Sequence, residues 1–240
     1  MPIERYYLDK PIILHATRLL KGPEFHHLAR VMRSRIGDRL ELVNGQGVLA
    51  QGIIENLSKE EATVRIEEII MEEPNPTRII LAQALPKLNR LDFILEKGTE
   101  LGVDEFWLFP GHLSLKKEFS ENQHERARTI TIAAMKQSGR LTLPKVSILP
   151  ALEKWLALEG TGFFGDLDAE APLLLNILKQ EPPNSSIFIF IGPESGWSEN
   201  EIKLLKNKGV KGVRLHKNIL RTDTASLVAL SLIQHHRLFL

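Results

Sequence analysis

Two loops in the last quarter of the chain carry side chains that can do chemistry. Glu194 lies in the segment 192–196 and Arg221 lies in the segment 218–225. A carboxylate in a tight, glycine-bounded turn can accept a hydrogen bond or a proton. A guanidinium beside the free amides of a helix start can bind anionic oxygen. Each loop follows a short apolar run typical of a buried parallel strand, so we expect the loops to form two walls of one site.

Both loops also have a plainer interpretation. Glu194 could be solvated on an ordinary strand-to-helix turn, because the glycine spacing fits neither a dinucleotide fingerprint nor a P-loop. Arg221 could pair locally with Asp223 on a helix capped by Thr222 or Asp223. The residues alone leave these alternatives open.

A second cluster of chemical interest lies near the N-terminus and is basic. His26 and His27 are followed by Arg30, Arg33 and Arg35. Closely spaced arginines are typical of contacts to nucleic-acid phosphates, which position a partner without reading its sequence. A solvated arginine face is the competing interpretation. No carboxylate–histidine pair has zinc spacing, so we expect no metal site.

The composition is that of a folded protein without thiol chemistry. The 240 residues are 43% hydrophobic and 25% charged, and there is no cysteine. Disulfides, thiolate metal sites and cysteine nucleophiles are therefore excluded. No run reaches the length of a membrane span and no signal peptide is evident, so we expect a cytoplasmic protein that does not bind membranes.

The net charge of +1 hides an uneven distribution along the chain. Residues 1–39 hold eight basic and four acidic side chains, residues 40–73 hold two and eight, and residues 201–240 hold eight and two. Segregated charge favours a polyanionic partner that meets particular faces of the protein. Solvated faces are an equally good interpretation of the charge pattern by itself.

The elements that position these clusters fall into two regions. The first is mostly β, with a short helix over 23–31, strands over 39–43, 47–54 and 62–70, and a hairpin turn at Asn44-Gly45. The segment 72–76 has two prolines in three residues and is the best linker. Beyond it, strands and helices alternate, which predicts a parallel sheet covered on both faces. The expected strands are 78–83, 105–109, 162–165, 187–191 and 213–215. The expected helices are 88–101, 120–137, 152–158, 171–178, 199–208 and 222–237, with a capping box at 198–201.

Several short motifs occur in a fixed order along the whole chain. They are His-Leu-Ala-Arg-Val-Met-Arg at 27–33, Gly-Asp at 37–38, Glu-Lys-Gly-Thr-Glu-Leu-Gly-Val at 96–103, Gln-Ser-Gly-Arg at 137–140, Ile-Gly-Pro-Glu-Ser-Gly at 191–196 and Asn-Ile-Leu-Arg-Thr-Asp-Thr-Ala at 218–225. In this order they resemble the ribosomal RNA small subunit methyltransferase E family, the uridine-N3 methyltransferases of the SPOUT superfamily.

The resemblance implies an α/β protein of two domains. Residues 1–72 would form a PUA-like RNA-binding β-barrel, and residues 73–240 a SPOUT α/β domain with a parallel sheet and a deep C-terminal trefoil knot. It also implies S-adenosyl-L-methionine as cofactor, a homodimer, and methylation of N3 of one uridine in the 16S rRNA of the small ribosomal subunit. The alternatives are a SPOUT enzyme acting on a ribose 2′-hydroxyl or on tRNA, and an RNA-binding or assembly protein that has lost cofactor binding.

Carried onto this sequence, the resemblance assigns roles to individual residues. Arg221 would stabilise negative charge, and Glu194 would act as base, substrate orienter or brace. The cofactor-binding residues would be Leu81, Gly165, Ile191, Gly192, Pro193, Gly196, Leu215, Ile219, Leu220, Thr222 and Ala225. The RNA-binding residues would be Arg5, His27, Arg30, Arg33, Arg35 and Arg140.

The chain departs from the family pattern at four positions. Ser195 and His216 stand where the family has glycine, Asn218 stands where it has arginine, and Lys136 stands where glutamate is common. The glycine replaced by His216 lets the backbone approach the cofactor closely. These departures bear on cofactor affinity and RNA contacts rather than on the fold.

Overall fold

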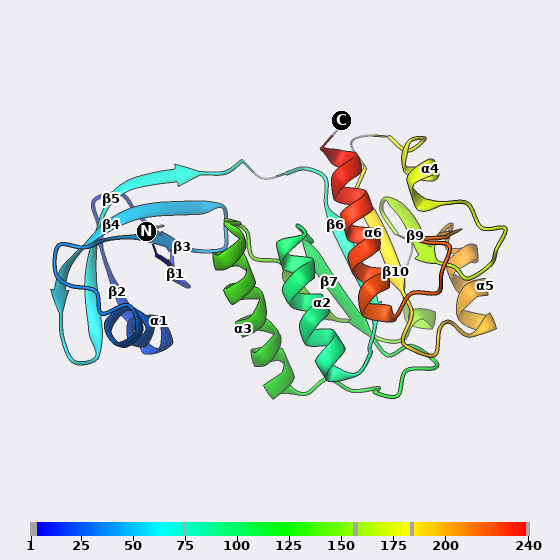
Figure 1. The fold of residues 1–240 in the computed structure, drawn as a ribbon, viewed down its shortest axis with the longest axis horizontal. Coiled ribbons are helices and arrows are strands. Elements are labelled where there is room, and N and C mark those ends of the chain that lie inside the picture. Colours follow the sequence, from blue (N-terminus) through cyan, green and yellow to red (C-terminus); the bar gives the residue numbers. More distant parts are fainter. Residues whose placement is uncertain (1–3, 74, 156–157, 183–184, 239–240) are drawn as a thin grey trace. The chain divides into compact units, whose positions relative to one another are not determined.

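The computed structural model describes residues 4–73, 75–155, 158–182 and 185–238 (Figure 1). The chain divides into two compact units. The first comprises Met1–Pro74 with Met135–Leu143, and the second comprises Asn75–Ala134 with Pro144–Leu240. The expected linker at 72–76 includes Pro74, which lies outside the described residues. The return of 135–143 to the first unit has no signal in the sequence.

The first unit is built on a five-stranded sheet with the order β1-β3-β4-β5-β2. All neighbours are antiparallel except β1 and β3. The strands are β1 Arg5–Tyr7, β2 Thr17–Lys21, β3 Arg39–Val43, β4 Val48–Leu57 and β5 Glu61–Met71. The three strands expected from the alternating pattern are confirmed. β1 and β2 were not predicted, because β1 has three residues and β2 is an edge strand with one buried side chain.

Two bulges in β4 curl this sheet into a half-barrel. The register with β5 shifts between Gln51 and Gly52 and again between Ile54 and Asn56. A bulge bends its strand and increases the local twist. Gly52 is required there, since a Cβ atom would lie 2.5 Å from Val64 Cγ1. The expected helix is present as α1, Gly22–His26, continued by a π-helical turn, His27–Val31.

The second unit is a six-stranded sheet in which every neighbouring pair is parallel, with the order β11-β9-β10-β6-β7-β8. The strands are β6 Ile79–Ala84, β7 Glu105–Phe109, β8 Lys145–Ile148, β9 Thr161–Gly165, β10 Ile187–Ile191 and β11 Lys211–Val213. The central strands β6 and β10 are buried along their whole length, which explains their unbroken apolar sequences. The expected parallel α/β sheet is therefore confirmed.

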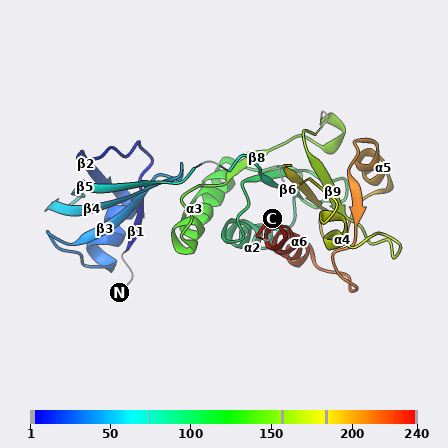
Figure 2. The same ribbon diagram turned by 90° about the horizontal axis from the view of Figure 1, so that it is seen from above.

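Helices cover both faces of the second sheet (Figure 2). The helices of this unit are α2 Leu88–Glu100, α3 Glu121–Ser138 as far as Ala134, α4 Leu174–Leu178, α5 Glu199–Asn207 and α6 Thr222–Arg237. Residues of α2, α4 and α6 share one apolar core with the sheet, and α5 shares the other with a 3-10 turn, Leu152–Lys154. Ser198 and Glu201 form the predicted capping box of α5.

Three expected elements differ from the structure. The helix over 152–158 is a single 3-10 turn as far as it is described, and residues 156–157 lie outside the described part. The helix over 171–178 begins only at Leu174, because the Pro172 carbonyl accepts a hydrogen bond from Arg214 N. The last strand ends at Val213 rather than Leu215, since the chain then pairs with Leu173. None of the described helices is long and apolar enough to span a membrane.

Candidate active site

A cavity of about 490 Å³ lies at the carboxyl ends of β9 and β10 in the second unit. β6 leads into α2 on one face of the sheet and β10 leads into α5 on the other. A crevice forms where neighbouring strands diverge in this way. The cavity is lined by Arg90, Gly165, Asp166, Leu167, Ile191, Gly192, Pro193, Glu194, Ser195, Gly196, Trp197, Ile202, Arg214, Leu215, His216, Asn218, Ile219, Leu220, Arg221, Thr222 and Ala225.

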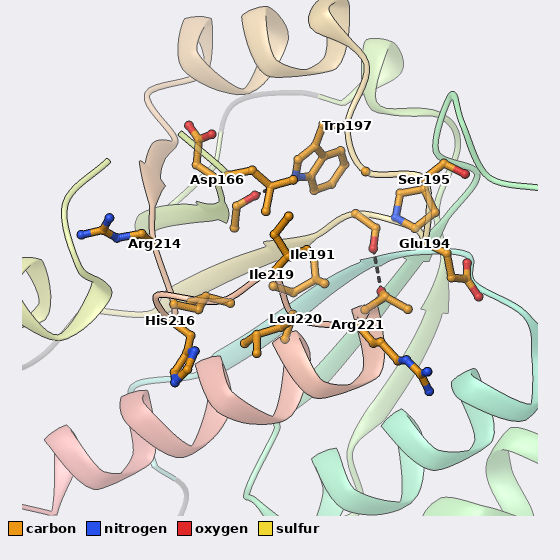
Figure 3. A pocket seen from close by; sticks show the side chains of 18 of the residues that line it. Asp166, Ile191, Glu194, Ser195, Trp197, Arg214, His216, Ile219, Leu220 and Arg221 are labelled. Atoms are coloured by element: carbon orange, nitrogen blue, oxygen red, sulfur yellow. Dashed lines mark hydrogen bonds between the residues drawn. The ribbon is translucent and has the colours of Figure 1, made fainter. Parts of the chain in front are cut away.

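The middle of the pocket is apolar and its ends are polar. Figure 3 shows Ile191, Ile219 and Leu220 below the indole of Trp197. The Trp197 Nε1 donates to the Gly165 carbonyl at 3.1 Å, which fixes the indole against the end of β9. Glu194 and Arg221 lie towards one end of the pocket, and Asp166, Arg214 and His216 lie towards the other (Figure 3).

A buried hydrogen-bond network joins the two loops beneath the pocket. Gln83, the fully buried penultimate residue of β6, donates from Nε2 to Thr222 Oγ1 at 3.0 Å, and its Oε1 accepts from Ser226 Oγ at 2.6 Å. Thr222 Oγ1 donates to the Gly192 carbonyl at 2.6 Å, drawn dashed in Figure 3. The two walls predicted from the sequence are thus held together through one glutamine, which the sequence analysis did not single out.

The start of α6 corrects one prediction. The N-cap residue is Arg221, with no side-chain cap, rather than Thr222 or Asp223. Thr222 cannot cap the helix because its hydroxyl is engaged with Gly192 and Gln83. Asp223, in the first helical turn, accepts from Arg90 NH1 of α2 at 2.9 Å.

Arg221 is exposed, and its side chain makes neither an ion pair nor a hydrogen bond within the part of the chain that the structure describes. The local pairing of Arg221 with Asp223, one of the two interpretations of this motif, is therefore wrong. Asp223 pairs with Arg90 instead. The guanidinium of Arg221 is free to meet an anionic group.

Glu194 is held by the start of α2. Its Oε1 accepts from the Lys87 backbone N–H at 3.1 Å and lies 3.2 Å from Arg90 Nε. Lys87 is the N-cap residue of α2, so the carboxylate also lies at the positive end of that helix. Among the roles left open for Glu194, these contacts favour bracing of the loop.

The structure brings together nearly all the residues that the sequence analysis assigned to this site. Leu81 is separate from them, because its side chain is fully buried in the core of the second unit. Arg90, Asp166 and Trp197 line the pocket without having been predicted. Asp166 follows directly after Gly165, so its place at a strand end was available as a signal. Arg90 had none.

The residues that depart from the family pattern leave the cavity open. The His216 Nδ1 accepts from the Asn218 N–H at 3.0 Å, and its ring points away from Ile191 and Trp197 (Figure 3). The fourth departure, Lys136, belongs to the first unit, where Nζ contacts Glu24 Oε1 at 2.6 Å. His216, which stands where the family has a glycine, therefore does not fill the pocket.

The residues assigned to RNA contact lie in the first unit. Arg30, Arg33 and Arg35 are exposed and their side chains have no ion pair within the described residues. Arg5 forms two hydrogen bonds to Glu41 Oε2, and Arg140 donates to Thr142 Oγ1. His27 lies against the ring of Tyr6, whose burial raises its pKa to about 12. Arg5 thus differs from the three exposed arginines, because it forms an ion pair with Glu41 within the unit.

No group of three or more potential ligand side chains, such as histidine or carboxylate, gathers in the described residues in a way that could hold a metal ion. The polar groups of the pocket are instead arginines, carboxylates and backbone amides. These suit an organic ligand with both charged and apolar parts.

The fold and the pocket place this chain in the class of proteins that combine a half-barrel unit with a parallel α/β unit holding a ligand site at its strand ends. Residues 73–234 match the RNA methyltransferase domain family, and residues 20–67 match the RNA methyltransferase PUA domain. The chain belongs to the ribosomal RNA small subunit methyltransferase E family.

Individual relatives agree with this placement. The chain is 30% identical to the ribosomal RNA small subunit methyltransferase E of Bacillus subtilis, with 97% of this chain and 96% of the relative covered. The crystal structure of the enzyme of that name from Neisseria gonorrhoeae, bound to S-adenosyl methionine, is 28% identical with a TM-score of 0.87 and covers 97% of both chains. A putative methyltransferase of Legionella pneumophila in complex with the same cofactor is 26% identical with a TM-score of 0.88 and covers 98% of both. The family expected from the motif order is confirmed.

Proposed function

We propose that this protein transfers a methyl group from S-adenosyl-L-methionine to N3 of one uridine in the 16S rRNA of the small ribosomal subunit. The observation that carries the proposal is a pocket lined by both predicted loops, with Arg221 at its rim and no side-chain partner for Arg221 among the described residues. Membership of the methyltransferase family supplies the reaction class. The relatives with bound cofactor supply its identity.

The pocket fits this cofactor in size and character. Its volume of about 490 Å³ lies in the range typical of small-molecule sites, and the apolar middle between Ile191 and Trp197 suits a purine ring. The residues proposed to hold the cofactor are Gly165, Ile191, Gly192, Pro193, Gly196, Leu215, Ile219, Leu220, Thr222 and Ala225. When bound, S-adenosylmethionine supplies an electrophilic methyl group on a sulfonium.

The acceptor nitrogen dictates what the residues of this chain must do. Uridine N3 carries a proton that leaves only at alkaline pH in water. In the proposed step this proton passes to solvent before N3 takes the methyl group, and its loss spreads negative charge onto O2 and O4. A preorganised cation at the rim stabilises that charge as it develops. Arg221 is proposed for this role because no carboxylate in the described part of the chain pairs with it. Glu194 is proposed to brace the loop at 192–196 from the start of α2.

Substrate binding is assigned to the first unit. Arg30, Arg33 and Arg35 are proposed to contact phosphates of 16S rRNA, because exposed arginines without carboxylate partners attract a polyanion. Arg5, His27 and Arg140 are proposed to support that surface. The target uridine must leave any base stack to reach the pocket, as in other enzymes that act on a base.

We infer the SPOUT trefoil knot for the C-terminal part of the second unit. Arg214 N donates to the Pro172 carbonyl and Leu174 N to the Arg214 carbonyl. The chain then runs back to Thr222, which is bonded to Gly192 below the pocket. A segment that pairs with one loop and anchors under another is consistent with a threaded path.

A homodimer is proposed on the exposed apolar side chains around the pocket. Ile219 is 80% exposed and Leu167 is 69% exposed, although both line the cavity. Large apolar groups at the mouth of a site favour burial by a partner. A second copy of this chain is the proposed partner.

Calorimetric titration with S-adenosylmethionine tests the proposed function at its first step. Saturable binding at one site per chain is expected, and a Gly165→Leu variant should lose it because the new side chain would enter the pocket. A wild-type protein that binds small ribosomal subunits but not the cofactor would instead identify an RNA-binding or assembly protein.

A further inference from the structure

Arg90 of α2 stands between two carboxylates at the reactive end of the pocket. Its Nε lies 3.2 Å from Glu194 Oε1 and its NH1 lies 2.9 Å from Asp223 Oδ1. The three side chains are 23%, 25% and 21% exposed, so they are partly shielded from solvent. Opposite charges interact more strongly in such surroundings than on an open surface.

The pairing matters because Asp223 is two residues from Arg221. The sequence alone allows Asp223, in the first turn of the helix that Arg221 precedes, to pair with Arg221. In the structure Arg90 occupies Asp223, and Arg221 has no side-chain partner among the described residues. Because Arg90 pairs with Asp223, the carboxylate of Asp223 is not available to Arg221. The guanidinium proposed to act in the reaction, that of Arg221, is therefore left without a partner among the described residues.

We propose that Arg90 is a positioning residue that captures Asp223 and thereby keeps Arg221 available for the substrate. The proposal rests on the proposed function, because it assigns Arg221 to the reacting uridine. Arg90 itself acts through Asp223, and its second contact to Glu194 holds the loop at 192–196 in the same arrangement. Loss of Arg90 would release Asp223, which would then pair with Arg221.

The test compares Arg90→Met with Arg126→Met, a matched control. Arg126 is an arginine of α3 that donates from Nε and NH2 to Asp92 Oδ2 of α2, outside the pocket. Methionine keeps helix propensity and much of the side-chain volume. We expect Arg90→Met to lower kcat by about 10²-fold, the effect of a misplaced catalytic group, with little change in KM for S-adenosylmethionine. Arg126→Met should change neither.

A second substitution separates positioning from direct contact. If Arg90 acts by occupying Asp223, then Asp223→Asn added to Arg90→Met should restore much of the lost kcat, since residue 223 then carries no charge to capture Arg221 and Glu194 keeps its hydrogen bond from the Lys87 N–H. If Arg90 instead contacts the substrate, the double variant will be no better than Arg90→Met. Thermal melting of each variant checks that the second unit remains folded. The kcat of Arg90→Lys should fall between that of the wild type and that of Arg90→Met.

A measurement independent of activity completes the test. NMR relaxation of the Arg221 Nε–H group should show a mobile side chain in the wild type, a restrained one in Arg90→Met, and a mobile one again in Arg90→Met/Asp223→Asn. If the wild type transfers no methyl group, the proposed function fails and this series alone decides the role of Arg90. Equal Arg221 mobility in all three proteins, or equal kcat for Arg90→Met and Arg126→Met in an active enzyme, would overturn the proposal.

Discussion

Arg221 lies where the chain turns from the pocket loop into α6, and its side chain has no ion-pair partner in the part of the chain that the structure describes. The residue is the N-cap of the helix, so its backbone lies next to the free amides of the first turn. Its side chain makes no cap hydrogen bond to them. The account of the reaction therefore depends on this side chain more than on any other.

Replacing Arg221 with alanine should remove most of the turnover. Loss of one preorganised donor to a developing charge costs about 10²–10³-fold in kcat. The substitution removes no ion pair, so the melting temperature should be unchanged. Lys217→Ala is the matched control, because Lys217 is an exposed cation of the same loop that does not line the pocket. Near-native turnover by a folded Arg221→Ala protein would remove Arg221 from the mechanism.

The sequence could predict which loops form the site but not how their charges are shared. Glu194 and Arg221 were found because they follow apolar runs and stand in recognisable motifs. Arg90 and Gln83 were missed because their roles come from contacts across 100 residues or more, such as the 133-residue separation of Arg90 and Asp223. Local patterns carry no record of such contacts.

Elements with an unambiguous pattern were predicted to the residue. The strands at 39–43, 105–109 and 187–191 and the final helix at 222–237 have the expected bounds. The errors fall where tertiary pairing overrides local preference. Pro172 and Leu173 pair with Arg214, after β11, instead of joining α4. The edge strand β2 has too few buried residues to be recognised.

A substitution of Gln83 tests whether the hydrogen bonds between β6 and α6 beneath the pocket stabilise the second unit. Gln83→Leu removes the hydrogen bonds to Thr222 and Ser226 while keeping the buried position filled by a side chain of similar size. Leaving buried polar groups without partners should cost about 1–3 kcal/mol of the free energy of unfolding. Urea unfolding followed by tryptophan fluorescence reports the second unit, because all three tryptophans lie there. Gln180→Leu, at an exposed position, is the control. Equal midpoints for the two variants would show that the network contributes nothing to stability.

At the scale of the whole molecule, the two basic segments of the chain belong to different units of the fold. The basic segment 1–39 belongs to the first unit, and the basic segment 201–240 belongs to the second. Each unit therefore holds one of the two basic segments, and the acidic segment 40–73 also belongs to the first unit. The near-neutral total limits attraction to other acidic surfaces.

The oligomeric state is a prediction at this scale. If a second copy covers the apolar side chains at the pocket mouth, light scattering should give about twice the chain mass of 27.2 kDa. An apolar interface should persist at high salt, which screens only the charged contacts. A mass near that of one chain at micromolar concentration would exclude the homodimer.

The most direct test of the central claim is methyl transfer from labelled S-adenosylmethionine to small ribosomal subunits that lack base methylation, followed by nuclease digestion and mass spectrometry of the nucleosides. The account predicts 3-methyluridine at a single position of 16S rRNA. Label on a ribose 2′-hydroxyl, or no label on subunits to which the protein binds, would contradict it.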